Sequence, residues 1–252
     1  MIAQDRALIP RLLRADNLTP PSRTPWGGTR IRDALKAGLN LGQSDARVGE
    51  SWEVSVEPSF PSRMQDTNTL LSDVIAEAPE AWLGHDVSRR YGGQLPLLVK
   101  LLDAADNLSV QVHPHDHDPL LEPDESGKPE SWIILDAEPG AGLYLGFKEG
   151  VGRQDVSTCL RDGGALNSLM NFVPVYRGDG FIIEAGTPHA IGKGITLIEP
   201  QHVTPSKRGV TYRFWDWNRR YDADGRQDPS GAPRPLHLAR SLDVTRWDGE
   251  QG

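Results

Sequence analysis

LSVQVHPH, at residues 108–115, is the stretch from which the rest of the sequence is best interpreted. Its two valines alternate with polar residues, which is the period of a β-strand. Ser109, Gln111 and His113 therefore share one polar face, opposite an apolar valine face. His nitrogen and Gln oxygen on one face can converge on a cation, so one interpretation is a metal site. The other is an edge strand whose polar face meets solvent.

Strand patterns continue on both sides of this stretch. We expect strands at 48–55, 97–104, 108–113, 130–137, 141–146, 172–176, 181–184, 188–191, 195–199 and 210–217. Many short strands separated by glycine-rich turns are typical of an all-β sandwich or barrel. Helical patterns occur at 72–90, where Ser72 is the predicted N-cap and Pro79 divides the helix, and at 153–162. Residues 222–235 look most like a linker.

Length and composition limit the class of protein. A chain of 252 residues makes one large domain or two small ones. With 27 basic and 35 acidic residues the net charge is -8, which argues against a nucleic-acid partner. The single cysteine, Cys159, excludes an intrachain disulfide framework and fits a reducing cytoplasm. No segment has the length of a membrane helix or the pattern of a signal peptide, so we expect a cytoplasmic protein without a membrane partner. The oligomeric state stays open.

Four positions far apart in the sequence can make one metal site: Gln111, His113, Glu130 and His189. Two imidazoles, a carboxylate and an amide form a nitrogen and oxygen set suited to zinc, manganese or iron. Their spacing is not a compact ligand signature. Taken singly, a glutamate in such a position is more often a surface carboxylate, and a histidine like His189 is more often a turn residue.

Two further histidines, His115 and His117, are rival ligands. Pro114 interrupts the strand before them, and aspartates flank them. We therefore expect both in a solvated loop.

Three cations stand in apolar or strand surroundings. Lys100 interrupts an apolar run, which is costly unless the charge is paired or faces a cleft. Lys128 precedes Glu130, and Arg213 lies in an aromatic strand where it can stack on rings. Exposure to solvent or stacking on an aromatic ring would explain each of these cations by itself. An anionic substrate such as a sugar phosphate would give all three a binding role. Glu199 is a candidate acid/base group or a buried ion-pair partner.

Several blocks of the sequence, in order and with fitting spacing, resemble type I mannose-6-phosphate isomerases. The strongest are PLLVKLLD at 96–103, LSVQVHP at 108–114, GKPESW at 127–132 and EAGTPHAIGKG at 184–194. WGG at 26–28, GESWE at 49–53 and TYR at 211–213 match further blocks. The resemblance runs from about residue 23 to about residue 243.

That family consists of zinc-dependent cupins that interconvert mannose 6-phosphate and fructose 6-phosphate through a cis-enediol. The resemblance implies a double-stranded β-helix (jelly roll) with a few short helices and one divalent cation, Zn²⁺. It makes the four residues above the zinc ligands and Arg213 catalytic. Glu199 becomes the proton-transfer group, with a metal-bound water as the alternative base. Lys100, Lys128 and Ser109 would line the substrate pocket, the last two holding the phosphate and Lys100 in reserve.

Two departures from the family concern the domains. Short bacterial members continue past residues 235–238 into a second β-domain, whereas this sequence ends at Gly252. We therefore expect a metal-binding cupin catalytic domain at 1–235, with short helical insertions, and the start of a C-terminal β-domain at 236–252. Residues 200–209 also look longer than in those relatives, which would alter the pocket rim.

Two other functions compete with an aldose–ketose isomerase. A metal cupin oxygenase would share the barrel and the histidine-rich site, but it gives the three cations no role. A sugar-binding cupin without catalysis is the alternative if the C-terminal part is needed for activity.

Overall fold

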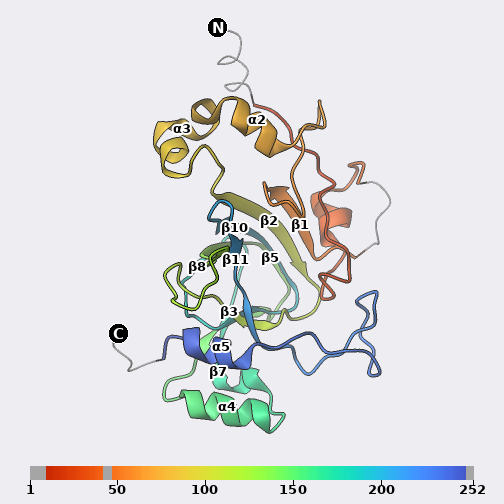
Figure 1. The fold of residues 1–252 in the computed structure, drawn as a ribbon. Coiled ribbons are helices and arrows are strands. Elements are labelled where there is room, and N and C mark those ends of the chain that lie inside the picture. Colours follow the sequence, from red (N-terminus) through yellow and green to blue (C-terminus); the bar gives the residue numbers. More distant parts are fainter. Residues whose placement is uncertain (1–9, 42–46, 248–252) are drawn as a thin grey trace.

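Strands provide most of the regular structure in the computed structural model, which describes residues 10–41 and 47–247 (Figure 1). The strands are β1 (Glu50–Val54), β2 (Leu97–Ala104), β3 (Val110–Val112), β4 (Glu125–Ser126), β5 (Glu130–Ala137), β6 (Gly142–Phe147), β7 (Met170–Pro174), β8 (Gly180–Ile183), β9 (His189–Ile191), β10 (Ile195–His202), β11 (Arg208–Gly209) and β12 (Tyr212–Trp215). Two five-stranded sheets have the orders β1-β2-β10-β5-β8 and β12-β3-β9-β6-β7. The prediction of a mainly β protein with few helices is confirmed.

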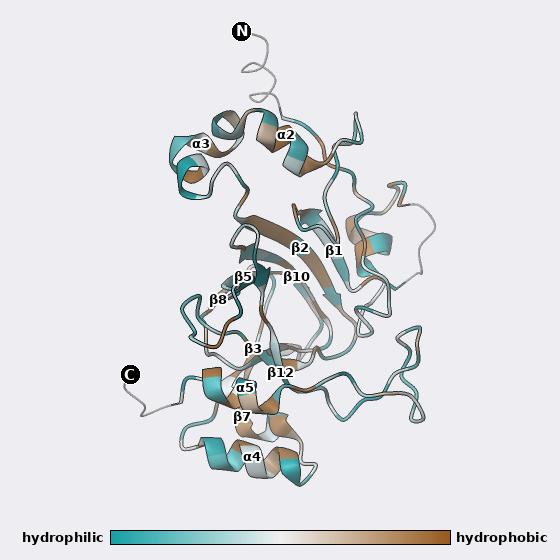
Figure 2. Cartoon of the chain, in the orientation of Figure 1, coloured by the Kyte–Doolittle hydropathy of each residue, from teal (hydrophilic) through white to brown (hydrophobic). Residues whose placement is uncertain are grey.

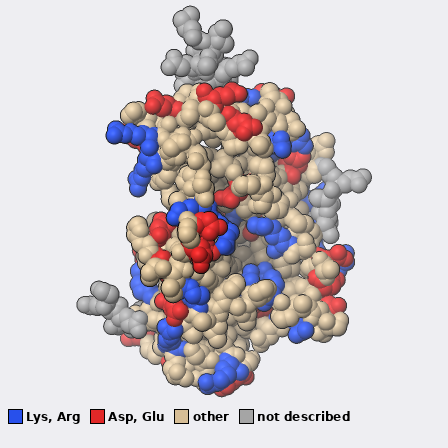
Figure 3. All heavy atoms as spheres, viewed as in Figure 1, with Lys and Arg blue, Asp and Glu red and all other residues tan. Residues whose placement is uncertain are grey.

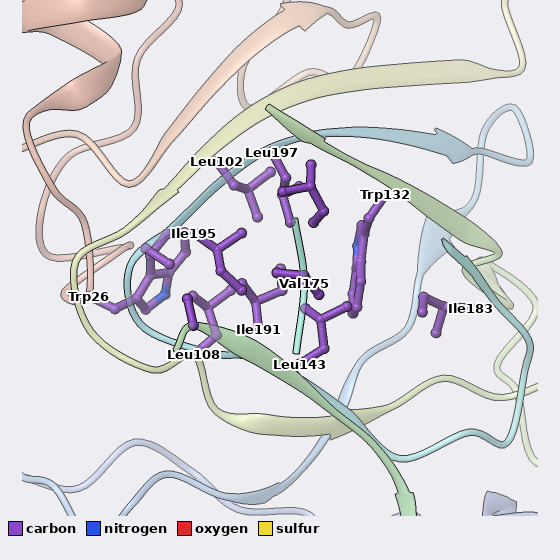
Figure 4. Packing of buried hydrophobic residues seen from close by; sticks show 13 residues of the cluster. Trp26, Leu102, Leu108, Trp132, Leu143, Val175, Ile183, Ile191, Ile195 and Leu197 are labelled. Carbon is purple, nitrogen blue, oxygen red and sulfur yellow. The ribbon is translucent and has the colours of Figure 1, made fainter. Parts of the chain in front are cut away.

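The main apolar core lies between the two sheets (Figure 4). Leu102 of β2 and Leu197 of β10 come from the first sheet, and Leu143 of β6 and Ile191 of β9 from the second. Neighbouring strands within each sheet are antiparallel. Because successive residues of a strand point to opposite faces, every second side chain of these strands turns inward.

The inward faces of β2 and β10 also carry charge. Lys100 lies two residues before Leu102, and Glu199 lies two residues after Leu197, so each pair shares a face. Lys100 and Glu199 are direct register partners across the two strands. β2 is mostly hydrophobic, as its brown colour in Figure 2 shows. The same strands that line the apolar core therefore also carry the polar residues of the site.

Short helices flank the sheets: α2 (Leu71–Glu77), α3 (Pro79–Arg90), α4 (Arg153–Arg161) and α5 (Leu238–Val244), with single turns η1 (Ile31–Leu35) and η2 (Leu166–Leu169). Pro79 begins α3, so the pattern at 72–90 forms two helices as predicted. The Ser72 cap was wrong, because α2 begins at Leu71 and the Ser72 hydroxyl donates to Asp73. Among the described residues, no helix is both long and apolar enough to cross a membrane.

Helices α4 and α5 pack against the outer face of the second sheet. Val156 of α4 and Leu242 of α5 join one buried cluster with Val110 and Val112 of β3. Trp247 belongs to the same cluster, so the chain after residue 235 contributes a helix to the core of this domain. The predicted division at residue 235 stays a prediction, as does the C-terminal β-domain.

Candidate metal centre and substrate cavity

Strand β3 lies inside its sheet, between β12 and β9. Its Gln111 is in register with His189 on one side and Arg213 on the other. The two valines fill the cluster under α4 and α5, which turns the polar face toward the space between the sheets. His113 is only 3% exposed. The edge-strand interpretation is therefore wrong.

Three predicted ligands converge on one point. His113, Glu130 and His189 each offer one ligand atom, and these atoms lie within 4.8 Å of one another. His113 Nε2 is 3.5 Å from Glu130 Oε2, and His189 Nε2 is 3.3 Å from Glu130 Oε1. His113 directly follows β3, and Glu130 and His189 are the first residues of β5 and β9. All three side chains are buried.

The histidine tautomers suit a metal. His113 Nδ1 lies 3.0 Å from the Val210 carbonyl oxygen, and His189 Nδ1 lies 2.9 Å from that of Thr187. Each Nδ1 must carry hydrogen to donate to a carbonyl, which leaves a bare lone pair on each Nε2. These lone pairs face carboxylate oxygens that also only accept. His113 Nε2 has no hydrogen-bond partner in the described chain, and Glu130 Oε2 has only the Lys128 ammonium beside it, so the donor set fits a cation held between them.

Burial and charge keep the ligands in metal-binding protonation states. Burial lowers the pKa of His113 to about 4, and the Lys128 cation adds to this shift. Burial would raise the pKa of Glu130, but Lys128 and the two histidines hold it well below its usual range. A neutral imidazole and an ionised carboxylate are the forms that bind metal.

A small cavity of about 50 Å³ is lined by two of the three ligands, Glu130 and His189. Gln111 lines it, and its amide has no hydrogen-bond partner within residues 10–41 and 47–247, so it is available as the fourth ligand. Its role as a ligand stays a prediction. The rival ligands His115 and His117 are exposed in the loop after Pro114, as expected.

A larger cavity of about 480 Å³ shares Gln111, Lys100 and Lys128 with the small one. This volume is typical of a small-molecule site. Basic side chains lie around a hollow near the middle of the face shown in Figure 3. Those lining the larger cavity are Arg23, Lys100, Lys128, Arg208, Arg213 and Arg234. In a protein with a net charge of -8, this local excess of cations favours an anionic ligand.

Lys100 and Glu199 form a buried ion pair on the wall of the small cavity. Lys100 Nζ is 2.9 Å from Glu199 Oε1 and 5.1 Å from the centre of the Trp52 ring. Trp132 Nε1 donates to the other carboxylate oxygen of Glu199 at 3.1 Å. Burial opposes the charged form of Lys100, but Glu199 and Glu50 outweigh it and raise its pKa. The lysine is thus paired and not exposed.

Arg213 is held from two sides. Its Nε donates to Ser109 Oγ at 3.1 Å, and its Nη1 donates to the Pro235 carbonyl at 2.8 Å. Burial lowers its pKa, and the nearby Arg234 cation contributes. An arginine nevertheless stays charged in a protein. Ser109 is buried and does not line either cavity, so its observed contact is with the arginine.

Comparison with known proteins gives one answer. The model of the type I phosphomannose isomerase catalytic domain matches residues 21–139. The mannose-6-phosphate isomerase of Streptococcus mutans is 34% identical over 222 residues, which is 87% of this chain and 63% of that relative. The resemblance to type I phosphomannose isomerases is thereby confirmed. The mannose-6-phosphate isomerase ManA of Bacillus subtilis is also 34% identical, over 87% of this chain and 64% of that relative.

Solved structures of mannose 6-phosphate isomerases share the fold. The crystal structure of the Bacillus subtilis enzyme superposes with a TM-score of 0.71 and 27% identity, covering 96% of this chain and 69% of that chain. A zinc-bound holo mannose 6-phosphate isomerase matches with a TM-score of 0.59 and 17% identity, over 88% of this chain and 71% of that chain. The present chain spans about 63% of the length of the Streptococcus mutans relative.

Sequence reasoning missed part of the site. Arg234 falls in the stretch interpreted as a linker, yet it lines the larger cavity and pairs with buried Asp216. Arg23 also lines that cavity, although no local pattern singles it out. Glu50 did carry a signal, because it lies in a block matched to the family. Its Oε2 accepts from Trp52 Nε1 at 2.9 Å, and it lines both cavities.

Proposed function

We propose that this chain carries the catalytic site of an isomerase that interconverts mannose 6-phosphate and fructose 6-phosphate with one bound Zn²⁺. The convergence of His113, Glu130 and His189, with bare nitrogens, beside a cavity lined by cations is the observation that carries the proposal. Zinc suits this nitrogen and oxygen set, and a neighbour of the same fold is described as zinc-bound. The named relatives support the substrate.

We further propose that the two sheets form the double-stranded β-helix of the cupins. Three features support this: the sheets are antiparallel, they enclose a shared core, and the ligands come from inward positions of different strands. A barrel of this type places a site inside, where strand faces alternate between inward and outward.

The reaction moves a proton between C2 and C1 through a cis-enediol, and negative charge develops on the sugar oxygens. A bound divalent cation would polarise the oxygens at C1 and C2. Arg213, which lies opposite Gln111 on the neighbouring strand β12, supplies a fixed positive charge to the site. Because its guanidinium is held by Ser109 and the Pro235 carbonyl, it needs little reorganisation as the charge forms. Ser109 acts here through the arginine.

Glu199 is the proposed proton-transfer group. Lys100 holds one of its oxygens and Trp132 the other, which fixes the direction of the carboxylate beside the small cavity. A carboxylate has about four lone-pair sites, so two contacts leave it able to accept a proton. Lys128 lies 3.1 Å from Glu130 Oε2, which places its ammonium at the metal end of the substrate.

The test is to add mannose 6-phosphate to the zinc-loaded chain and to follow fructose 6-phosphate by NMR. Formation of fructose 6-phosphate without oxygen uptake supports the isomerase. Oxygen uptake would instead favour the cupin oxygenase, and saturable binding without turnover would favour the sugar-binding cupin. His113→Ala, loaded in the same way, is the negative control.

A further inference from the structure

We propose that Arg23 binds the phosphate group of the sugar phosphate. The proposal deepens the proposed function and rests on it, because it assigns the end of the substrate that the metal does not hold. It differs from the expectation that Ser109 and Lys128 bind the phosphate.

The first argument is the pairing of the cations that line the larger cavity. Four of the six have a carboxylate partner, so their charge is already balanced. These pairs are Lys100–Glu199, Lys128–Glu130, Arg208–Glu125 and Arg234–Asp216. Only Arg23 and Arg213 line this cavity without such a partner in the described part of the chain. An arginine without a carboxylate partner offers a phosphate its full charge and its two-bond N–H fork.

The second argument is how Arg23 is held. Its guanidinium carbon lies 5.4 Å from the centre of the Trp52 ring and 5.0 Å from that of Phe60. The two rings pack against each other with centres 5.2 Å apart. Stacking uses the faces of a guanidinium and leaves its N–H groups at the edge free for a planar, two-bond contact to phosphate. Within residues 10–41 and 47–247 these N–H groups have no hydrogen-bond acceptor.

The third argument is position. A bound metal would act at C1 and C2, and the phosphate is on C6, at the opposite end of the sugar. Arg23 lines the larger cavity but not the small cavity beside His189 and Glu130. Arg213, the other candidate, also lines only the larger cavity, but its strand position is next to Gln111 and its guanidinium is already held by Ser109 and the Pro235 carbonyl. Lys128 is at the metal end, because its partner Glu130 is one of the ligands.

The experiment compares Arg23→Gln with wild type on mannose 6-phosphate and on unphosphorylated mannose. We expect the ratio of the two kcat/KM values to fall roughly 10- to 100-fold, the scale of one or two charge-assisted hydrogen bonds. Arg177→Gln is the matched control, since Arg177 is an exposed arginine that lines a different cavity. It removes the same charge and should keep the wild-type ratio. An unchanged ratio in Arg23→Gln, or an equal fall in the control, would overturn the proposal.

A binding measurement separates this proposal from the proposed function. Titration calorimetry with mannose 6-phosphate on the zinc-loaded chain should show the same loss of affinity in Arg23→Gln. If wild type binds but does not turn over, the isomerase proposal fails and the calorimetry still decides the role of Arg23. Arg23→Lys keeps the charge but loses the planar fork, so it should lie between wild type and Arg23→Gln. Equal affinity in all three proteins would exclude a phosphate contact.

Discussion

Asp216 and Arg234 form a two-bond ion pair, with Oδ2 2.7 Å from Nε and Oδ1 2.7 Å from Nη2. Asp216 directly follows β12, and Arg234 lies 18 residues further along. The pair therefore closes the intervening loop. The next residue, Pro235, then has its carbonyl oxygen 2.8 Å from Arg213 Nη1. The orientation of the proposed catalytic arginine thus depends on an ion pair formed by its own strand and the returning loop.

Asp216→Asn should consequently impair catalysis without affecting the metal. The neutral amide has one acceptor oxygen and no charge, so it cannot form the two-bond ion pair with Arg234, and the Pro235 carbonyl is less firmly placed against Arg213. We expect kcat to fall roughly 10-fold, the scale of one hydrogen bond, at unchanged zinc content. Asp224→Asn changes an exposed aspartate of the same loop and serves as the control. Equal kcat values in both variants would show that the loop does not position the arginine.

The same aspartate should make stability depend on pH. Burial would raise the pKa of Asp216, but Arg234 and Arg219 outweigh it and lower the pKa from the usual 3.8. A lowered folded-state pKa stabilises the protein fully above about pH 4, and this contribution is lost as pH falls through the folded value. Urea unfolding between about pH 5 and pH 3 should therefore show a smaller loss of stability in Asp216→Asn than in wild type. A steeper loss in the variant would contradict the assigned shift.

The sequence predicted the regular parts of the fold well, for a physical reason. β2 and β5 were expected at 97–104 and 130–137, and both strands have those bounds. Period-2 alternation and the turn residues around them are local signals. Helix α5 was missed because its apolar residues are explained only by their packing against β3 and β12, which lie elsewhere in the sequence.

The sequence likewise predicted some of the site residues and missed others. The convergence of His113 and His189 followed from family blocks, whereas strand periodicity alone left an edge strand open. Arg23 and the Asp216–Arg234 pair gave no local signal, since a stacked arginine and a loop-closing ion pair depend on the folded path of irregular segments. Lys100 was predicted only in part. The cost of burying its charge in an apolar run predicted a partner, but only the register of β2 with β10 identified that partner as Glu199.

Arg213→Ala tests the electrostatic role of this arginine. Loss of a preorganised donor to the developing enediolate should lower kcat by roughly 10²–10³. KM and zinc content should change much less, because the interaction is made chiefly in the transition state. Steady-state kinetics and metal analysis of the same preparation check this. An intact kcat with a raised KM would instead assign Arg213 to substrate binding.

Breaking the Lys100–Glu199 pair should cost stability. Both side chains are buried, so Glu199→Gln leaves the Lys100 ammonium without its counter-charge. Removing one partner of a buried pair typically costs about 3–5 kcal/mol. The double variant Lys100→Met/Glu199→Gln should be destabilised by less than the sum of the two single changes. Urea unfolding of the metal-free proteins provides the comparison, and strict additivity would argue that the two residues are not coupled.

Removing one ligand should separate metal binding from folding. His113→Ala deletes a neutral imidazole whose bare Nε2 faces Glu130, so zinc should bind far more weakly. His115→Ala is the matched control, because that imidazole is exposed two residues further along. Zinc should raise the thermal midpoint of wild type and of the control, since a ligand that binds only the folded state stabilises it, and should do so little in His113→Ala. A chelator should abolish the difference between wild type with zinc and wild type without it. If His113→Ala retained zinc while His115→Ala lost it, the ligand set would have to be redrawn around the loop histidines.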